Sequence, residues 1–245
     1  MIATPAYGGL ISTGYFTSIL RLMSNPEVRK KYQVEVFTIS NDALIPRARQ
    51  ECVKTALDHR CDRLLFVDAD IIFTPEDFLM VLDSNKPVIG GTYRKKCPEP
   101  IFNFNVKEDT ERHVREKFGD RVSSNSIKGM KELQNLSDNG ILEVTHIPTG
   151  FMCIDISVII ELAKVVPNYV TDRRSNHKLE YNAMEIQKYL VPELFPVRVN
   201  NNILESEDWG FCRLCKENNI PVYLHTDVIV DHIANLSLGH SLTDN

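Results

Sequence analysis

Residues 63–70 read Arg-Leu-Leu-Phe-Val-Asp-Ala-Asp, and this stretch decides the fold that we expect. The apolar run Leu64–Val67 predicts a buried strand, and Asp-Ala-Asp follows it directly. Thr74 and Pro75 then predict a helix start, with the threonine as N-cap and the proline at the first helical position. A strand that leads through an acidic loop into a helix is typical of α/β proteins.

The same alternation continues on both sides of this stretch. Strands are predicted over residues 2–4 and 32–39, and helices over 13–23 and 46–57. A further short strand is predicted at residues 87–90. We therefore expect an α/β fold with a mostly parallel central sheet and helices on both faces.

The second half of the chain is less regular. Residues 103–140 are rich in charge, Ser, Asn and Gly, which predicts a surface excursion or a mobile loop, and residues 166–200 are also irregular and polar. The remaining segments predict strands over 141–147, 151–156, 222–224 and 228–230, and helices over 157–165 and 205–218. Because no internal repeat or low-complexity linker is visible, we expect a single domain over residues 1–245.

Composition narrows the class of protein. The chain has 245 residues, a formal net charge of -5 and a sequence pI of about 5.8, which argues against tight non-specific binding to nucleic acid. No apolar run approaches the roughly 18 residues of a membrane-spanning helix, and no targeting segment is visible. Cys212 and Cys215 have ligand-like spacing but no second ligand pair, so reduced cysteines and a cytoplasmic location are expected.

The two acids of the Asp-Ala-Asp segment carry the strongest chemical signal. In an open α/β sheet, ligands bind beyond the carboxyl ends of the strands, which is where Asp68 and Asp70 are expected. Acids two residues apart in an extended segment point the same way, and their hard oxygens suit Mg²⁺ or Mn²⁺. Thr74 already caps the next helix, so helix capping does not explain the two acids.

Five segments, in this order along the chain, resemble the GT-A glycosyltransferases, especially the inverting family-2-like enzymes and their viral and phage relatives. They are Ala3–Gly9, Asn41–Arg49, Leu65–Ile71, Pro148–Met152 and Glu205–Phe211. The resemblance implies a GT-A, Rossmann-like version of the α/β fold. It also implies a nucleotide-sugar-binding half over residues 1–100 and an acceptor-binding, catalytic half over residues 101–245, and, for a viral chain, the host cytoplasm as its location.

The resemblance implies a donor site built from several loops. Its members would be Thr4, Pro5 and Tyr7 around the nucleotide base, Asp42 at the base or ribose, Arg47 near the base or diphosphate, Asp68 and Ala69, and Thr149 and Gly150 beside the donor sugar. UDP is the nucleotide implied first, with GDP and dTDP behind it.

The resemblance also implies the metal ligands and the catalytic base. Asp68, Asp70 and His232 would hold Mn²⁺ or Mg²⁺, which stabilises the charge that develops on the leaving diphosphate. The acceptor hydroxyl must lose a proton as it attacks, and the acidic pair before Trp209 offers Asp208 as the first candidate for the base and Glu207 as the second. A base on the face opposite the diphosphate predicts inversion at the anomeric carbon.

The expected activity is therefore metal-dependent transfer of a sugar from a nucleotide diphosphate donor, with UDP-sugar as the first candidate, to a hydroxyl of a glycan or another acceptor. A nucleic-acid acceptor is open but not favoured. Three alternatives stay open as well. They are a nucleotidyltransferase that acts on sugar phosphates, a non-catalytic nucleotide-sugar-binding module, and a metal-dependent hydrolase of the same donor. The Gly8-Gly9 loop lacks the following lysine of a phosphate-binding loop, which argues against the nucleotidyltransferase.

Overall fold

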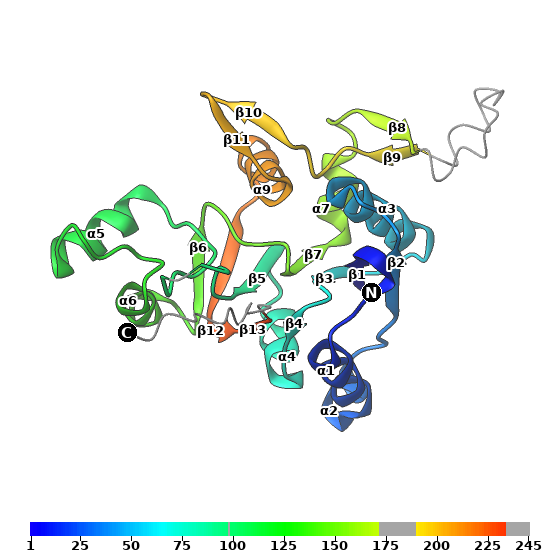
Figure 1. Cartoon of the computed structure of the whole chain (residues 1–245), viewed down its shortest axis with the longest axis horizontal. Helices are drawn as coiled ribbons and strands as arrows, with labels where there is room; N and C mark the ends of the chain where they lie inside the picture. Colours follow the sequence, from blue (N-terminus) through cyan, green and yellow to red (C-terminus); the bar gives the residue numbers. More distant parts are fainter. Residues whose placement is uncertain (98, 172–189, 234–245) are drawn as a thin grey trace, which may run out of the picture.

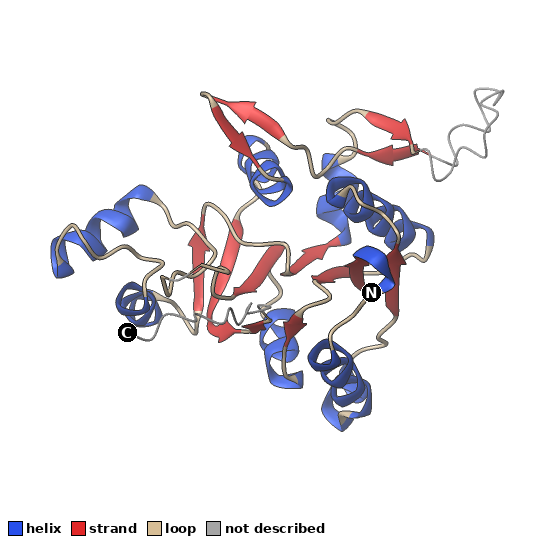
Figure 2. Ribbon diagram, in the orientation of Figure 1, coloured by secondary structure: helices blue, strands red, loops and turns tan. Residues whose placement is uncertain are grey.

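The computed structural model describes residues 1–97, 99–171 and 190–233. A central sheet of seven strands, in the order β2-β1-β3-β7-β5-β12-β6, is flanked by helices above and below in Figure 1. Strands β2, β1, β3, β5 and β12 share one direction, whereas β7 and the edge strand β6 run opposite to them. The prediction of an α/β fold with a mostly parallel sheet and helices on both faces is confirmed (Figure 2).

The described elements have the following bounds. The strands are β1 (Ile2–Ala6), β2 (Val36–Ser40), β3 (Arg63–Val67), β4 (Ile71–Ile72), β5 (Val88–Thr92), β6 (Ile141–Val144), β7 (Phe151–Asp155), β8 (Asn168–Val170), β9 (Leu190–Pro192), β10 (Arg198–Asn200), β11 (Ile203–Glu205), β12 (Val222–Ile229) and β13 (Asp231–His232). The helices are the short 3-10 helix η1 (Tyr7–Gly9), α1 (Thr13–Ser24), α2 (Pro26–Lys31), α3 (Ile45–Asp58), α4 (Pro75–Asp83), α5 (Glu108–Phe118), α6 (Ile127–Leu136), α7 (Ile156–Leu162) and α9 (Glu207–Glu217). None of these helices combines the length and the apolar character needed to cross a membrane.

Strand β3 shows why an uninterrupted apolar run is needed at the centre of the sheet. Leu64 and Phe66 face one core, which includes buried residues of α3, α7 and α9. Leu65 and Val67 face the other core, with buried residues of α1, α2 and α4. Since successive strand residues point to opposite faces, a strand covered by helices on both sides must be apolar at every position.

Helix α4 begins as its sequence predicts. The hydroxyl of Thr74 accepts from the backbone N–H of Asp77 at 3.1 Å, and the Asp77 carboxylate accepts from the backbone N–H of Thr74 at 2.8 Å. This reciprocal capping box satisfies two N–H groups that the first helical turn leaves unpaired. The Asp-Ala-Asp acids are thus free of a capping role, as expected.

Helix α1 is present, but a different face is buried from the one its apolar residues suggest. Tyr15 and Leu22 are buried, whereas Phe16 and Leu20 are 50% and 52% exposed. The Tyr15 hydroxyl is hydrogen-bonded to the hydroxyl of Thr4 at 2.6 Å. The Tyr15 hydroxyl can face the core because Thr4 of β1 is its hydrogen-bond partner. The apolar pattern of α1 alone does not reveal this partner.

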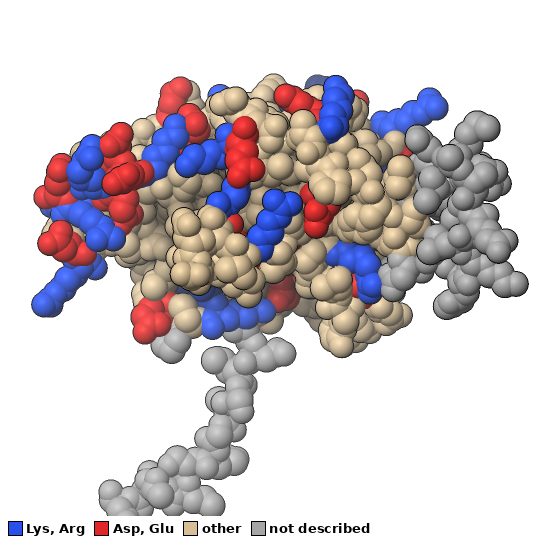
Figure 3. Space-filling view, turned by 90° about the horizontal axis from the view of Figure 1, so that it is seen from above, with Lys and Arg blue, Asp and Glu red and all other residues tan. Residues whose placement is uncertain are grey.

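The prediction of a surface excursion or a mobile loop over residues 103–140 missed two helices, because this segment contains α5 and α6. Helix α5 is composed mostly of charged residues and buries only Val114, and charged side chains of both signs gather at the left end of the molecule in Figure 3. Helix α6 starts at the N-cap Ser126, whose hydroxyl accepts from the N–H of Gly129 at 3.1 Å. The two strands predicted over residues 222–230 form the single strand β12, which pairs with β5 on one side and β6 on the other.

Candidate active site

A hollow of about 710 Å³ opens at the edge of the sheet where β1 and β3 end. It is lined by the end of β1 and the residues that follow it, by the Asp-Ala-Asp loop after β3, by the beginnings of α3 and α9, and by one residue each after β5 and β13. These residues are Pro5, Tyr7, Leu10, Ile11, Ser12, Ile45, Arg49, Asp68, Ala69, Asp70, Lys96, Glu207 and Ile233. The carboxyl ends of parallel strands are where α/β proteins bind ligands, so this hollow is the candidate active site.

Arg49 lies in the floor of the hollow and connects two of its acids. Its Nη2 donates to Oδ1 of Asp68 at 2.9 Å, and its Nε donates to Oε1 of Glu207 at 3.3 Å. The Arg49 side chain is only 4% exposed and lies over the ring of Phe66, 5.3 Å from its centroid. Burial alone would lower the pKa of Arg49, but Asp68 and Glu207 outweigh burial and raise it. Arg49 therefore carries a fixed positive charge between two acids that are far apart in the chain.

Asp70 is contacted by a lysine and a histidine. The Lys96 ammonium donates to Oδ2 of Asp70 at 2.5 Å, and Nε2 of His232 lies 3.5 Å from the same oxygen. The backbone holds this cluster in place, because β13 pairs with β4 and places His232 opposite Ile71. Burial would raise the pKa of Asp70, but His232 and then Lys96 outweigh it and lower it to about 2. The carboxylate is consequently ionised at neutral pH.

The metal ligands that the sequence predicts are only partly assembled. Asp70 and His232 meet, as described, whereas Asp68 is engaged by Arg49. Within the described ranges, no group of three or more His, Cys, Asp and Glu residues is arranged to hold a metal ion. Asp70 and His232 offer a hard carboxylate oxygen and an imidazole nitrogen, which are ligand types that would suit a divalent cation.

Four of the residues predicted for the donor site separate into two groups. Pro5, Tyr7 and Ala69 line the hollow, and Tyr7 is 68% exposed there. Thr4 is fully buried beneath it and is held by Tyr15.

Asp42 and Arg47 form an ion pair with each other at the start of α3. Arg47 Nη2 donates to Oδ1 of Asp42 at 2.8 Å, and the Asp42 carboxylate also accepts from the backbone N–H of Leu44 at 3.0 Å. Neither side chain is among those that line the hollow. In this structure their contacts shape the loop that precedes α3.

Thr149 and Gly150 lie directly beside the Asp-Ala-Asp loop. The backbone N–H of Asp68 donates to the carbonyl of Gly150 at 3.0 Å. A Cβ on Gly150 would come within 2.4 Å of the Tyr93 hydroxyl, so only glycine fits against this buried ring. Thr149 is itself buried. This pair therefore positions the Asp68 backbone and lies behind the residues that line the hollow.

The two acids at the start of α9 point to different surroundings. Glu207 lines the hollow and contacts Arg49, whereas Asp208 is not among the lining residues. Oδ2 of Asp208 lies 3.3 Å from Nε2 of the fully buried His146, and that imidazole stacks on the Trp209 indole with 4.3 Å between ring centroids. Burial would raise the pKa of Asp208, but His146, followed by a hydroxyl and a backbone N–H, lowers it to about 2.

Three residues of this region did not figure among the predicted site residues. Arg49 carried a usable signal, since it lies beside the apolar helix positions Ala48, Cys52 and Val53, and an arginine on a buried face needs acidic partners. Lys96 belongs to the basic run Arg94–Lys96, whose sequence is compatible with a phosphate-facing patch but favours a solvated loop, and His146 had no local motif. Only the tertiary structure brings these two to acids.

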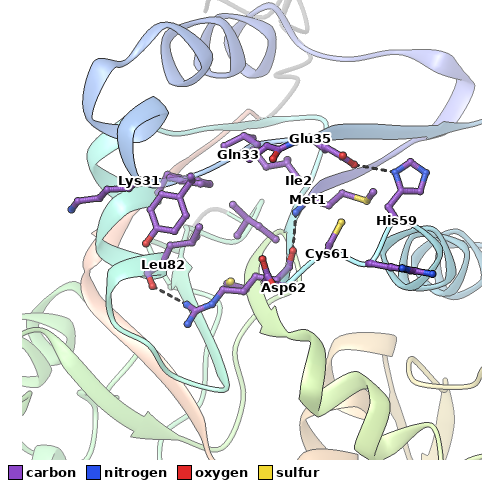
Figure 4. Close-up of a pocket in the computed structure, with 16 residues that line it drawn as sticks. Met1, Ile2, Lys31, Gln33, Glu35, His59, Cys61, Asp62 and Leu82 are labelled. Carbon is purple, nitrogen blue, oxygen red and sulfur yellow. Dashed lines mark hydrogen bonds and ion pairs between the residues drawn. The ribbon is translucent and has the colours of Figure 1, made fainter.

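A second hollow, of about 430 Å³, lies at the opposite ends of β1 and β3 (Figure 4). Several of its polar groups are paired with one another or with nearby backbone. The Met1 amino group donates to the Arg63 carbonyl at 2.7 Å, Arg63 Nη1 donates to the Leu82 carbonyl at 2.8 Å, and His59 lies 3.0 Å from Glu35. Because it is remote from the Asp-Ala-Asp loop and from the carboxyl ends of the strands, we do not assign the predicted chemistry to it.

No protein-family profile matches this sequence, and no curated protein does. Among solved structures, the chain is similar to A197 from STIV, with 15% identity over 98% of both chains and a TM-score of 0.47. It is also similar to CMP:2-keto-3-deoxy-manno-octonic acid synthetase complexed with CTP, with 10% identity over 94% of this chain and 89% of that one and a TM-score of 0.40. Mannose-1-phosphate geranyltransferase from Thermus thermophilus shares 13% identity over 66% of this chain and 59% of its own, with a TM-score of 0.35. These distant likenesses assign neither a family nor a function to the chain.

Proposed function

We propose that this chain is a metal-dependent glycosyltransferase that takes a sugar from a nucleotide diphosphate donor, with UDP-sugar as the first candidate, and transfers it to an acceptor hydroxyl with inversion. The observation that carries the proposal is the convergence of Asp68, Asp70 and Glu207 with Arg49 and Lys96 in one hollow at the carboxyl edge of the sheet. Carboxylates for a cation and a base, together with cations for phosphate, are the groups that this reaction requires.

The donor half of the proposal rests on Asp70 and His232. These residues would hold Mn²⁺ or Mg²⁺, and the bound cation would stabilise negative charge on the departing diphosphate. Arg49 orients Asp68 through the 2.9 Å hydrogen bond. Tyr7 and Pro5 line the same hollow and offer an exposed aromatic ring and a rigid backbone for the nucleotide base.

The acceptor half of the proposal rests on Glu207. Of the two acids before Trp209, Glu207 faces the hollow, whereas Asp208 faces the buried His146. A carboxylate with a pKa of about 2 is also a weak proton acceptor, which disfavours Asp208 as the base. We therefore assign removal of the acceptor proton to Glu207, with Asp208 as the residue that anchors the start of α9.

The first test is calorimetric titration of UDP into the protein with and without Mn²⁺. The wild type should bind UDP only when Mn²⁺ is present, and Asp70→Ala should abolish that binding because it removes the carboxylate at the proposed cation site. Asp120→Ala is the matched control, since Asp120 is an exposed acid in the loop after α5. GDP and dTDP serve as the next ligands, and absence of metal-dependent binding for all three would refute the proposal.

Product analysis separates the proposed transferase from its alternatives. Incubation with a UDP-sugar panel, Mn²⁺ and hydroxyl acceptors should release UDP and form a glycosylated acceptor. Release of inorganic diphosphate from a nucleoside triphosphate and a sugar phosphate would instead identify a nucleotidyltransferase. Binding of a UDP-sugar without turnover, across the acceptor panel, would identify a binding module.

A further inference from the structure

Lys96 forms an ion pair with Asp70, and both residues line the hollow. The 2.5 Å contact between Nζ and Oδ2 is shorter than the 3.5 Å separation of His232 Nε2 from the same oxygen, so the lysine is the nearer of the two groups. Both partners are partly exposed, at 44% for the Lys96 side chain and 36% for Asp70. The pair is thus accessible from the hollow rather than sealed in the core.

The charges of the hollow explain why a counter-ion is needed there. Asp68, Asp70 and Glu207 oppose only Arg49 and Lys96, which leaves the charged lining with one negative charge in excess. A nucleotide diphosphate would be repelled by this lining. A divalent cation reverses the excess to one positive charge, and it also competes with Lys96 for Asp70.

The position of Lys96 allows it to leave Asp70 without disturbing the fold. Lys96 lies in the loop after β5. The backbone of this loop is held at the preceding residue, where the Lys95 N–H donates to the Ile101 carbonyl at 2.8 Å. A lysine ammonium on a flexible four-carbon stem can move between acceptors, and an exposed ion pair of this kind is weak. The released ammonium stays at the rim of the hollow, where a phosphate would bind.

We propose that Lys96 is the resident counter-ion of Asp70, that a divalent cation displaces it, and that the released ammonium then binds the diphosphate of the donor. This inference rests on the proposed function, because it assumes that the hollow takes a nucleotide diphosphate. It assigns Lys96 two successive acceptors, the Asp70 carboxylate and then a phosphate oxygen. Cation binding therefore precedes nucleotide binding.

The experiment measures Mn²⁺ binding and UDP binding separately, by calorimetry, on wild type, Lys96→Ala and Lys95→Ala. Without nucleotide, Lys96→Ala should bind Mn²⁺ about two- to fivefold more tightly than wild type, because the cation no longer competes with an exposed ion pair. With saturating Mn²⁺, the same variant should bind UDP about tenfold more weakly, because a charged hydrogen bond to phosphate is lost. Lys95→Ala removes an exposed neighbouring lysine and should match wild type in both titrations.

Tighter Mn²⁺ binding together with weaker UDP binding in Lys96→Ala distinguishes the proposed role of Lys96 from a structural one. Weaker binding of both ligands by Lys96→Ala, or unchanged Mn²⁺ affinity, would overturn the inference, and so would unchanged UDP affinity. Lys96→Arg should keep most of the UDP affinity, since it retains a positive charge. If wild type itself fails to bind UDP, GDP or dTDP with Mn²⁺, the proposed function fails. If wild type binds and Lys96→Ala matches it, only the Lys96 inference fails.

Discussion

Arg49 donates through Nη2 to Oδ1 of Asp68 at 2.9 Å, from a buried position in the first half of α3. The same guanidinium reaches Glu207 through Nε, while its Nη1 is buried without a hydrogen-bond partner among the described residues. One buried cation thus connects the loop after β3 with the start of α9. Its removal would leave two acids without their shared partner.

Arg49→Met should therefore lower both stability and activity. Loss of one member of a buried charge cluster leaves uncompensated charge, and we expect the free energy of unfolding to fall by about 3 kcal/mol. Chemical denaturation followed by circular dichroism measures this change. Arg121→Met, at an exposed arginine, is the control and should stay within about 0.5 kcal/mol of wild type. Equal effects of the two substitutions would contradict the role of Arg49.

Glu207→Gln should separate catalysis from donor binding. Removal of the general base should lower kcat by about 100-fold or more, while the affinity for UDP and Mn²⁺ changes little. Asp208→Asn should retain more of kcat, because Asp208 faces His146 and does not line the hollow. Steady-state kinetics on both variants, with a UDP-sugar and an acceptor that wild type uses, measures the difference. A larger loss of kcat in Asp208→Asn than in Glu207→Gln would indicate that Asp208 is the general base.

The stability contribution of Asp208 should depend on pH. Its pKa is lowered from 3.8 to about 2 in the folded state, so the stabilisation is present above about pH 4 and disappears as the pH falls towards 2. We expect wild type to exceed Asp208→Asn by about 2 kcal/mol in unfolding free energy at about pH 5, and the difference to vanish near pH 2. Asp70 titrates in the same range in both proteins and cancels in the comparison. A difference that does not change with pH would contradict this prediction.

Gly150→Ala should destabilise the loop behind the hollow. The new Cβ would lie 2.4 Å from the Tyr93 hydroxyl and 2.8 Å from the ring carbon Cε1, and this buried ring has little room to move. Overpacking of this kind lowers the free energy of unfolding by about 1–3 kcal/mol. Thermal unfolding of Gly150→Ala, Tyr93→Leu and the double variant measures the coupling. The double variant should be more stable than the sum of the two single changes implies, and simple additivity would contradict the contact.

Much of the fold could be predicted from short stretches of sequence, because many strands and helices are marked by apolar runs or by helix-capping residues. The apolar run of β3 and the Thr74-Pro75 start of α4 each depend on neighbouring residues only, and both are present in the structure. Helix α5 was missed because it buries a single residue, Val114, and is otherwise mostly charged, so its composition resembles that of a surface loop. Helix α1 exposes Phe16 because its buried face is chosen by contacts with distant strands.

The candidate site likewise contains residues that the sequence predicted and contacts that only the structure revealed. Asp68 and Asp70 were predicted from their place at the end of a strand, where α/β sheets gather ligand-binding side chains, and Glu207 was implied by the resemblance as the second candidate behind Asp208; all three line the hollow. The sequence by itself thus determined the α/β class, the sheet edge and the acids. Only the tertiary structure decided that Arg49 holds Asp68 and Glu207, that Lys96 lies on Asp70, and that Asp208 turns to His146. These pairings join residues far apart in the chain, and charge pairing depends on distance in space, which no local pattern encodes.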